Sequence, residues 1–375
     1  MSEPLLPDAA SLLGTARRIT VKVGSSLLVD GQGLRTEWIR SLGSDLAALR
    51  HEGREVVLVS SGAVALGRGW ITRASGLDGK QAAAAIGQPL LMQAWQEALA
   101  DAGIPTAQLL LTFDDTESRR RWLNARATLE VLLRNGALPV INENDTVATE
   151  ELRYGDNDRL SARVAQMVRS DVLVLLSDVD GLYTADPASQ PDAQHVPSVI
   201  ELHEALGWAS SYSSSGMGSG GMRTKLEAAR IAQGAGCATI IASGREIHPL
   251  GRLATGEARS TLVMRKGSPA KAYKQWIVGA LSPAGSVTID DGAAKALGGG
   301  KSLLPAGVVS VKGDFAHGAC LSILGHDGRE LGRGITRYAS TEADRIIGAK
   351  ASEIEARLGY SRGDELVHRD DLVLL

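Results

Sequence analysis

The sequence predicts an α/β protein whose mostly parallel sheet carries helices on both faces, followed by a small, mainly β module. Three observations support this prediction. Apolar, β-branched runs alternate with stretches of helical spacing between residues 18 and 243. The length of 375 residues exceeds what one hydrophobic core usually organises, so two domains are expected. Near residue 265 the chain becomes polar, basic and punctuated by Gly and Pro, and only short strand patterns follow.

Composition narrows the classes of function. Hydrophobic residues make up 44% of the chain and charged residues 22%, which is ordinary for a soluble globular protein. The net charge of −3 offers no global basic field for nucleic acid or an anionic membrane. Cys237 and Cys320 lie far apart, so we expect neither a disulfide framework nor a metal knuckle.

The N-terminus lacks the charge pattern of a signal peptide, and no stretch reaches the roughly 20 apolar residues of a membrane span. We therefore expect a cytoplasmic protein without a membrane partner.

The first domain opens with patterns that follow from the spacing of apolar residues. The run over 18–28, broken at Gly24, predicts a buried strand that leads into a turn. Apolar residues at helical spacing predict a helix over 36–52. A strand over 56–60 comes next, then helical patterning through an Ala- and Gln-rich segment to residue 102.

The same alternation continues along the chain. Strands are expected over 108–112, 138–142, 172–177 and 238–242, and helices over 119–135, 159–169 and 224–233.

The second domain is predicted to be small and rich in short strands. Residues 265–282 are expected to link a first domain over 18–264 to a module over 283–375, with residues 1–17 as an N-terminal extension. Asp327-Gly328 is a hairpin signal within this module. One short helix is expected late in it, over 342–357. A module of about 90 residues has the size of a minor domain.

The first candidate site is the segment KVGSSLL, which begins at Lys22. A lysine within an apolar strand is costly to bury unless an anion meets it. Gly24 and Ser25 follow at the strand's carboxyl end, where backbone N–H groups of α/β proteins bind ligands. Lys22 is thus a candidate anion ligand; the alternative is a lysine at the sheet rim whose ammonium group reaches water.

The second candidate is VSSGAVALG, residues 59–67, again at a strand end. Gly62 permits close approach of the backbone, and Ser60 and Ser61 can donate hydrogen bonds to a carboxylate or a phosphate. A plain strand–turn–helix with a serine N-cap is the alternative.

The third candidate is the polar segment over 139–162, which reads PVINENDTVATEELRYGDNDRLSA. Asn142, Asp145 and Asn157 combine donors with acceptors, which suits the ammonium and carboxylate groups of an amino acid. Asp158 is expected as the N-cap of the next helix. A solvated acidic loop is the alternative, and we favour a binding site.

The fourth candidate is LLSDVDGLYTADP, residues 175–187, where an apolar strand ends at Ser177 and Asp178. This turn can hold an adenine or a ribose, although Asp-Gly turns are common in any protein.

The fifth candidate is SSGMGSGGMRTK, residues 214–225. It is rich in glycine and ends in a lysine, but Met222 and Arg223 follow the last glycine, which excludes the P-loop spacing. Another kind of nucleotide loop and a flexible linker both remain open from the residues alone.

Taken together, these segments resemble the amino acid kinase family. The final module resembles the PUA domain through SLLPAGVVSVKGDF, RGITRY and VHRDDLV. Each motif is weak by itself, but their joint order with the PUA-like tail is specific. In the first domain the matching pieces occur in the order KVGSSLL, VSSGAVALG, LNAR, PVINEND, GDNDRLSA, SDVDGLYTADP and GSGGMRTKLEAA.

The resemblance implies a three-layer αβα sandwich. It also implies, through the branch of the family that carries a PUA domain, transfer of the γ-phosphoryl group of ATP to the side-chain carboxylate of L-glutamate, the first step towards proline. ATP with Mg²⁺ would be the cofactors, and no protein-held metal site is expected.

The resemblance further implies roles for individual residues. Lys22 and Lys225 would bind and neutralise the phosphoryl groups, and Asp158 would hold the two lysines in position. Glutamate would be bound by Ser61, Asp145 and Asn157, with Asn142 in support. The nucleotide would be contacted by Lys22, Gly24, Ser25, Ser177, Asp178, Ser219, Gly220, Gly221, Met222, Arg223, Thr224 and Lys225.

Several alternative functions are compatible with parts of the sequence. Aspartokinases, acetylglutamate kinases and carbamate kinases share the fold, but acetylglutamate kinases have little use for Asp145 and aspartokinases usually end in ACT-type domains. An RNA-binding protein is the rival from another class. Residues 281–375 contain 11 Lys or Arg and 13 Asp or Glu, so strong RNA binding by the tail is not expected. By resemblance, a homodimer or homotetramer and feedback inhibition by proline are possible.

Overall fold

The computed structural model describes residues 7–31, 33–71, 73, 76–148, 157–209, 221–279 and 281–375. The chain divides into two compact units, Met1–Pro269 and Ala270–Leu375. Within the described residues, no helix is long and apolar enough to cross a membrane.

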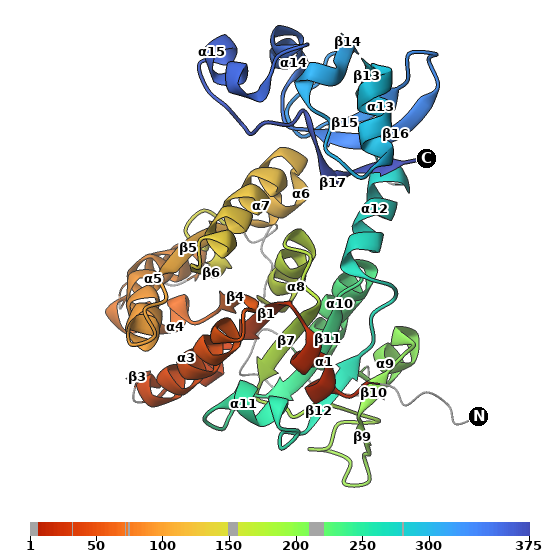
Figure 1. Cartoon of the computed structure of the whole chain (residues 1–375). Coiled ribbons are helices and arrows are strands. Elements are labelled where there is room, and N and C mark those ends of the chain that lie inside the picture. Colours follow the sequence, from red (N-terminus) through yellow and green to blue (C-terminus); the bar gives the residue numbers. More distant parts are fainter. Residues whose placement is uncertain are drawn as a thin grey trace, which may run out of the picture. The chain divides into compact units, whose positions relative to one another are not determined.

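The first unit is organised around one eight-stranded sheet (Figure 1). Its strand order is β10-β12-β11-β7-β1-β4-β6-β5. The six strands from β11 to β5 run parallel, whereas β12 runs antiparallel to β11. The strand bounds are β1 Arg18–Val23, β4 Glu55–Ser60, β5 Thr106–Leu111, β6 Leu138–Glu143, β7 Val172–Ser177, β10 Ser198–Val199, β11 Ala238–Ser243 and β12 Ser260–Val263.

Helices connect the strands, and the predicted helices are found as α3, α5, α7, α8 and α10, whereas α1, α6, α9 and α11 were not predicted. A further deviation follows Gly24, where the chain forms a four-residue helix, α2, in place of a simple turn. The helices are α1 Ala9–Thr15, α2 Ser25–Leu28, α3 Thr36–His51, α4 Ala63–Gly67, α5 Gly76–Ala100, α6 Phe113–Glu117, α7 Arg119–Arg134, α8 Asn157–Met167, α9 Leu202–Ala209, α10 Met222–Gly234 and α11 Pro249–Ala254.

Both faces of the sheet are covered, which confirms the three-layer αβα sandwich. Along β7, Val174 packs into one hydrophobic core and Leu175 into another, as the alternation of side chains across a strand requires. The first core also contains Trp95 of α5, and the second contains Leu226 of α10. Helix α1, in the N-terminal extension, buries Leu13 in the first core.

The second unit contains a five-stranded sheet with the order β14-β13-β15-β16-β17 and a core of its own, which confirms the mainly β module. The predicted hairpin lies between β15 and β16, and Gly328 adopts a φ of +80° there. The predicted late helix is broken at Gly348, whose φ is +70°, into α14 and α15. The bounds are α12 Pro269–Gly279, β13 Gly285–Ile289, α13 Asp291–Gly298, β14 Val308–Lys312, β15 Cys320–Leu324, β16 Glu330–Thr336, α14 Ser340–Ile346, α15 Ile354–Leu358 and β17 Val367–Leu374.

Candidate active site

The parallel strands of the first unit end at one edge of the sheet. Val23 at the end of β1 pairs with Ser60 of β4 on one side and with Leu176 of β7 on the other. Ser177 of β7 in turn pairs with Ser243 of β11. Strand β1 lies where successive strands diverge to opposite sides, the position at which open α/β sheets bind ligands. Four of the five candidate segments begin or end at this edge.

A buried cluster of two lysines around one aspartate lies beside this edge. Lys22 Nζ lies 2.6 Å from Asp158 Oδ1, and Lys225 Nζ lies 3.2 Å from Asp158 Oδ2. The exposed fractions are 6% for Lys22, 4% for Lys225 and 0% for Asp158. Thr224 also donates its hydroxyl to Asp158 Oδ2, at 3.3 Å. Residues from β1, α8 and α10, far apart in the sequence, are thus brought together.

The electrostatics of this cluster favour an ionised carboxylate between two ammonium groups. Burial raises the pKa of Asp158, but the charges of Lys22 and Lys225 outweigh that effect and lower the pKa to about 2. One carboxylate faces two cations, so the cluster carries a net positive charge in a nearly dry place. A site of this charge attracts an anion such as a phosphate.

The expectation that Asp158 is an N-cap is wrong. Helix α8 begins at Asn157, which places Asp158 in its first turn, and the carboxylate of Asp158 forms ion pairs with the two lysines. The alternative of a solvated Lys22 at the sheet rim is also excluded, because its ammonium group is paired and buried.

A second cluster of amide and hydroxyl groups connects β4, β6 and α8. Asn157 Nδ2 donates to Ser61 Oγ at 2.9 Å and to Asn142 Oδ1 at 2.8 Å. Asn142 Nδ2 donates to Gln88 Oε1 at 2.8 Å, and the backbone N–H of Glu143 donates to Asn142 Oδ1 at 2.9 Å. Asn157 and Asp158 are neighbours in α8, so the first turn of this helix belongs to both clusters.

The two serines of VSSGAVALG have different surroundings. Ser60 is fully buried, and its hydroxyl accepts a hydrogen bond of 2.9 Å from Trp95 Nε1, which makes it part of the packing of α5. Ser61 faces Asn157. Gly62 between Ser61 and α4 has a φ of +108°, a conformation that favours glycine.

Asp145 lies in the turn that follows β6 and is half-buried. The turn is anchored by Asn144, whose backbone N–H donates to Leu111 O at 2.9 Å and whose side-chain oxygen accepts from Thr146 Oγ1 at 2.6 Å. Asn142 lies near the end of β6, and Asp145 lies in the turn after this strand, three residues further along the chain.

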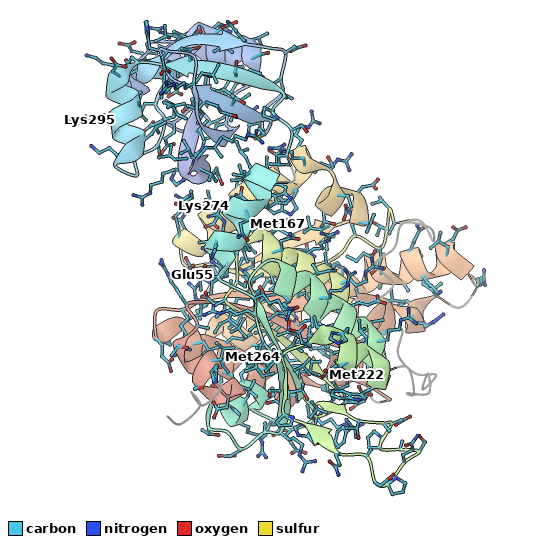
Figure 2. All side chains as sticks on the ribbon, turned by 90° about the vertical axis from the view of Figure 1, so that its right-hand side faces the viewer. Glu55, Met167, Met222, Met264, Lys274 and Lys295 are labelled. Atoms are coloured by element: carbon cyan, nitrogen blue, oxygen red, sulfur yellow. The ribbon has the colours of Figure 1, made fainter. Side chains whose placement is uncertain are left out.

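Residues at the start of α10 divide between the core and the surface. Met222, labelled in Figure 2, is the first residue of the helix and is buried in the second hydrophobic core. Arg223 points outward, with 79% of its side chain exposed, and pairs with Glu227 at 3.3 Å. Gly221 at the N-cap accepts a hydrogen bond from Thr224 Oγ1. Ser219 and Gly220 lie outside the described residues.

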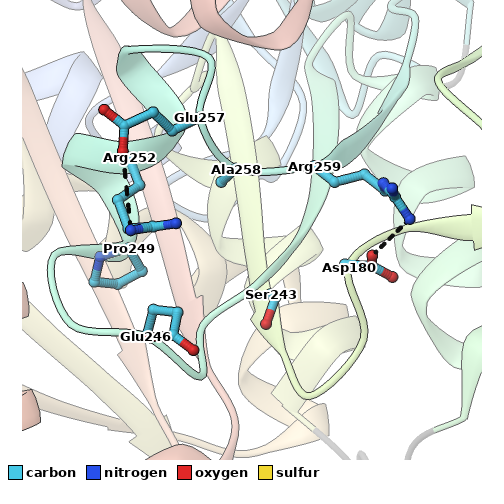
Figure 3. A pocket seen from close by; sticks show the side chains of 8 residues that line it. All are labelled: Asp180, Ser243, Glu246, Pro249, Arg252, Glu257, Ala258 and Arg259. Carbon is cyan, nitrogen blue, oxygen red and sulfur yellow. Dashed lines mark hydrogen bonds and ion pairs between the residues drawn. The ribbon is translucent and has the colours of Figure 1, made fainter.

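A cavity of about 340 Å³ opens beside the ends of β7 and β11 (Figure 3). Ser243, which pairs with Ser177, forms part of its wall. Ion pairs of Arg259 with Asp180, at 3.4 Å, and of Arg252 with Glu257, at 3.9 Å, frame it. Ser177 donates its hydroxyl to Asp178 at 2.9 Å at the same edge.

Gln88 is the site residue that sequence reasoning missed. It belongs to the long helix α5 and is 8% exposed. A glutamine within the apolar stretch AAAAIGQPLL was the available signal, because a buried amide needs partners that the flanking alanines and leucines cannot supply.

Comparisons with known proteins identify the families that the two parts of the chain match. The model of the amino acid kinase family matches residues 17–243, and that of the PUA domain matches residues 285–358. A protein named glutamate 5-kinase from Caulobacter vibrioides (strain NA1000 / CB15N) is 55% identical over 96% of this chain and 97% of its own length. Another of that name from Paramagnetospirillum magneticum (strain ATCC 700264 / AMB-1) is 53% identical over 97% of this chain and 99% of its own.

Among solved structures, the carbamate kinase from Giardia lamblia bound to AMP-PNP has a TM-score of 0.50 and 16% identity. The similarity covers 67% of this chain and 99% of that one, and at this identity it supports the fold alone. The family match spans more than half of the chain and contains both clusters at the sheet edge. The chain belongs to the amino acid kinase family.

Proposed function

We propose that the protein transfers the γ-phosphoryl group of ATP to the side-chain carboxylate of L-glutamate, which gives L-glutamyl 5-phosphate, the first step of proline biosynthesis. The observation that carries this proposal is the identity of 51–55% to proteins named glutamate 5-kinase over nearly the whole chain. The two clusters at the sheet edge supply groups that fit both substrates.

The chemistry needs positioning and charge neutralisation more than proton transfer. The side-chain carboxylate of glutamate is ionised near neutral pH, so it attacks without a general base. One of its oxygens forms a bond to the γ-phosphorus, while the bond from that phosphorus to the β–γ bridging oxygen breaks and ADP leaves with that oxygen. The obstacle is repulsion between two anions, and Lys22 and Lys225 reduce it.

Asp158 sets the geometry of this neutralisation. Its carboxylate separates and fixes the two ammonium groups, one from β1 and one from α10. In this proposal Lys22 contacts the phosphates already bound in the ground state, and Lys225 meets the charge on the group in transfer. Backbone N–H groups at Gly24 and Ser25 lie next to Lys22, and a Cβ added to Gly24 would come within 3.9 Å of Lys22 Nζ.

The amide cluster is assigned to the amino acid end of glutamate. The ammonium group needs acceptors, which Asn157 Oδ1 and the carboxylate of Asp145 provide. The α-carboxylate needs donors, and the hydroxyl of Ser61 is one. Asn142 accepts a hydrogen bond from Asn157 Nδ2 and so holds the Asn157 side chain in position.

The nucleotide is assigned to the other side of β1, along Ser177, Asp178 and the start of α10. The cavity beside Ser243 gives room for part of a nucleoside at this edge. Among the described residues, no group of three or more His, Cys, Asp or Glu gathers to hold a metal ion. Mg²⁺ is assigned to the triphosphate of ATP, whose oxygens it commonly binds.

An acceptor comparison tests the proposed function. Purified protein with ATP, Mg²⁺ and hydroxylamine, which traps acyl phosphates as hydroxamates, is given glutamate, aspartate, N-acetylglutamate or carbamate. We expect ATP-dependent product with glutamate alone. Equal or higher activity with another acceptor would assign the chain to a different branch of the family, and no activity with any acceptor would refute the kinase assignment.

Four further expectations belong to this proposal. A homodimer or homotetramer in solution is expected, to be tested by light scattering. Inhibition by proline is expected to weaken as glutamate is raised, because both would compete for the glutamate site or the loop after Asp145. Weak RNA binding by the PUA domain and a cytoplasmic location complete the proposal.

A further inference from the structure

Gln88 lies behind the proposed glutamate site and does not belong to any of the motifs that define it. We propose that Gln88 is a positioning residue that, together with the backbone N–H of Glu143, holds the amide cluster in its orientation and thereby supports the preference for an amino acid over a plain dicarboxylate. This inference rests on the proposed function and assigns to that site a residue that determines its specificity.

The direction of every hydrogen bond in the cluster follows from one backbone group. The N–H of Glu143 can only donate, so the atom of Asn142 that it meets at 2.9 Å is an oxygen. The other end of the Asn142 amide is then the nitrogen, and it donates to Gln88 Oε1 at 2.8 Å. Gln88 and Glu143 therefore hold the Asn142 amide at its two ends.

The fixed amide of Asn142 orients the groups that face the substrate. Asn142 Oδ1 accepts from Asn157 Nδ2 at 2.8 Å, so the nitrogen of Asn157 points inward. The second hydrogen of that nitrogen is donated to Ser61 Oγ at 2.9 Å. Asn157 Oδ1 is consequently directed away from the cluster as an acceptor, and the Ser61 hydroxyl, having accepted, has its own hydrogen to donate.

These two orientations match an α-amino acid. An acceptor at Asn157 suits the ammonium group, and a donor at Ser61 suits the α-carboxylate. If the cluster ran in the opposite direction, both groups would present the wrong sign to glutamate. The direction of these hydrogen bonds is thus a determinant of specificity. Gln88 is the last acceptor in the chain of hydrogen bonds, at the end opposite to Ser61.

The packing of Gln88 indicates that stability does not explain its presence. Its side chain is more than nine-tenths buried, and its Nε2 has no hydrogen-bond partner among the residues that the structure describes. A buried donor without a partner is destabilising. A methionine of similar shape would remove this unpaired donor but would leave Asn142 Nδ2 without its acceptor, so the two effects offset each other and the amide oxygen is the feature that a glutamine adds here.

The fold brings Gln88 to this place through a close contact of two helices. A Cβ on Gly87 would lie 1.8 Å from Ala63 O, so α5 approaches α4, which follows Ser61, as closely as backbones allow. Two turns further along α5, Trp95 donates to the hydroxyl of Ser60. Gln88 and Trp95 lie on the same side of the helix. Gln88 is hydrogen-bonded to Asn142 of β6, and Trp95 is hydrogen-bonded to Ser60 of β4.

Kinetics of Gln88→Met with three acceptors test the proposal. The acceptors are glutamate, glutarate, which lacks the ammonium group, and 4-aminobutyrate, which lacks the α-carboxylate. Gln93→Met, the same change at an exposed position of α5, is the matched control. Gln88→Glu keeps an oxygen acceptor opposite Asn142 and is the conservative variant. Thermal midpoints and the KM for ATP report on the integrity of the fold and of the nucleotide site.

In Gln88→Met the Asn142 nitrogen loses its acceptor, so the Asn142 and Asn157 amides can leave their orientation when no substrate is bound. Binding of glutamate must then restore that orientation, which weakens the affinity. We expect the KM for glutamate to rise roughly five- to twentyfold, the size of one hydrogen bond with a buried partner. The preference for glutamate over glutarate, as a ratio of kcat/KM, should fall by a similar factor. The KM for ATP and the thermal midpoint should stay near those of wild type and of Gln93→Met, and Gln88→Glu should keep the preference.

Three results would overturn the proposal: an unchanged preference in Gln88→Met, an equal loss of preference in Gln88→Glu, or a Gln88→Met protein without a cooperative melt, which would make Gln88 a requirement of the fold. Each variant is measured against wild type, so these results are distinct from failure of the proposed function, in which wild type itself would not phosphorylate glutamate.

Discussion

Replacement of Asp158 by asparagine removes the one carboxylate between two buried lysines. The substitution nearly preserves the shape of the side chain but deletes its charge. One end of the new amide would face an ammonium group with N–H hydrogens, because both carboxylate oxygens are engaged, at 2.6 Å by Lys22 and at 3.2 Å by Lys225. Two cations with exposed fractions of 6% and 4% would then lack their counterion.

The size of the effect follows from the electrostatics of the native cluster. The pKa of Asp158 falls from 3.8 to about 2 on folding, which corresponds to about 2 to 3 kcal/mol at 1.4 kcal/mol per unit. Because two buried ammonium groups would be left without a partner, the total cost should approach the 3–5 kcal/mol of a broken buried ion pair. We expect Asp158→Asn to lower the free energy of unfolding of the first unit by roughly 3 kcal/mol.

The dependence on pH has a defined sign. The folded pKa lies below the unfolded one, so the contribution of Asp158 is fully present above about pH 5 and is lost as the pH falls towards about 2. The difference in stability between wild type and Asp158→Asn should therefore be constant near neutral pH and shrink in acid.

Urea unfolding followed by tryptophan fluorescence measures this difference. Of the six tryptophans only Trp276 lies beyond Pro269, so the signal reports mainly on the first unit. Glu52→Gln, which removes the charge of an exposed glutamate that pairs with the half-buried Arg54 at 2.9 Å, is the control and should cost no more than about 1 kcal/mol. If Asp158→Asn cost no more than the control, or if its difference from wild type did not shrink in acid, the reasoning about a buried charged cluster would be refuted.

Two other substitutions test the remaining parts of the site. Asp145→Ala should raise the KM for glutamate roughly ten- to hundredfold through the loss of one charge-assisted hydrogen bond, with a smaller change in kcat; an unchanged KM in steady-state assays would remove Asp145 from the glutamate site. Gly87→Ala would place a Cβ 1.8 Å from Ala63 O and should destabilise the first unit by about 2 kcal/mol or more, whereas Gly69→Ala, with nothing within 4 Å, should have little effect. Equal melting temperatures for these two variants would contradict the close contact of α4 and α5.

Much of the fold could be predicted from the sequence because its signals are local. The strands β1, β4, β6, β7 and β11 are short apolar runs, and their helices carry apolar residues at helical spacing, so both kinds of element follow from neighbouring residues. Strands β10 and β12, the last two at one end of the sheet, were not predicted, since two and four residues give little periodicity. The break between α14 and α15 depends on the conformation of Gly348, which the helical pattern around it does not reveal.

The sequence indicated that the candidate residues lie at the ends of neighbouring strands. It did not indicate which of these side chains contact one another. Lys22, Asp158 and Lys225 were grouped through family resemblance, whereas their residue types alone left Lys22 open to a solvent-exposed interpretation. The structure shows what decides between the two: the pairing of residues more than 60 positions apart in the sequence. Gln88 illustrates the same limit, because a glutamine in an Ala-rich helix gains its meaning only from the asparagine that it meets across the core.

The most direct test of the central claim is the turnover of Lys225→Met with saturating glutamate and ATP. Methionine keeps the buried apolar stem of the side chain but removes the ammonium group that lies 3.2 Å from Asp158. If this charge stabilises the phosphoryl group in transfer, kcat should fall by roughly 10²–10³-fold, with the KM for glutamate changed only a few-fold. A kcat within a few-fold of wild type in a folded variant would contradict the claim that the two-lysine cluster performs the chemistry.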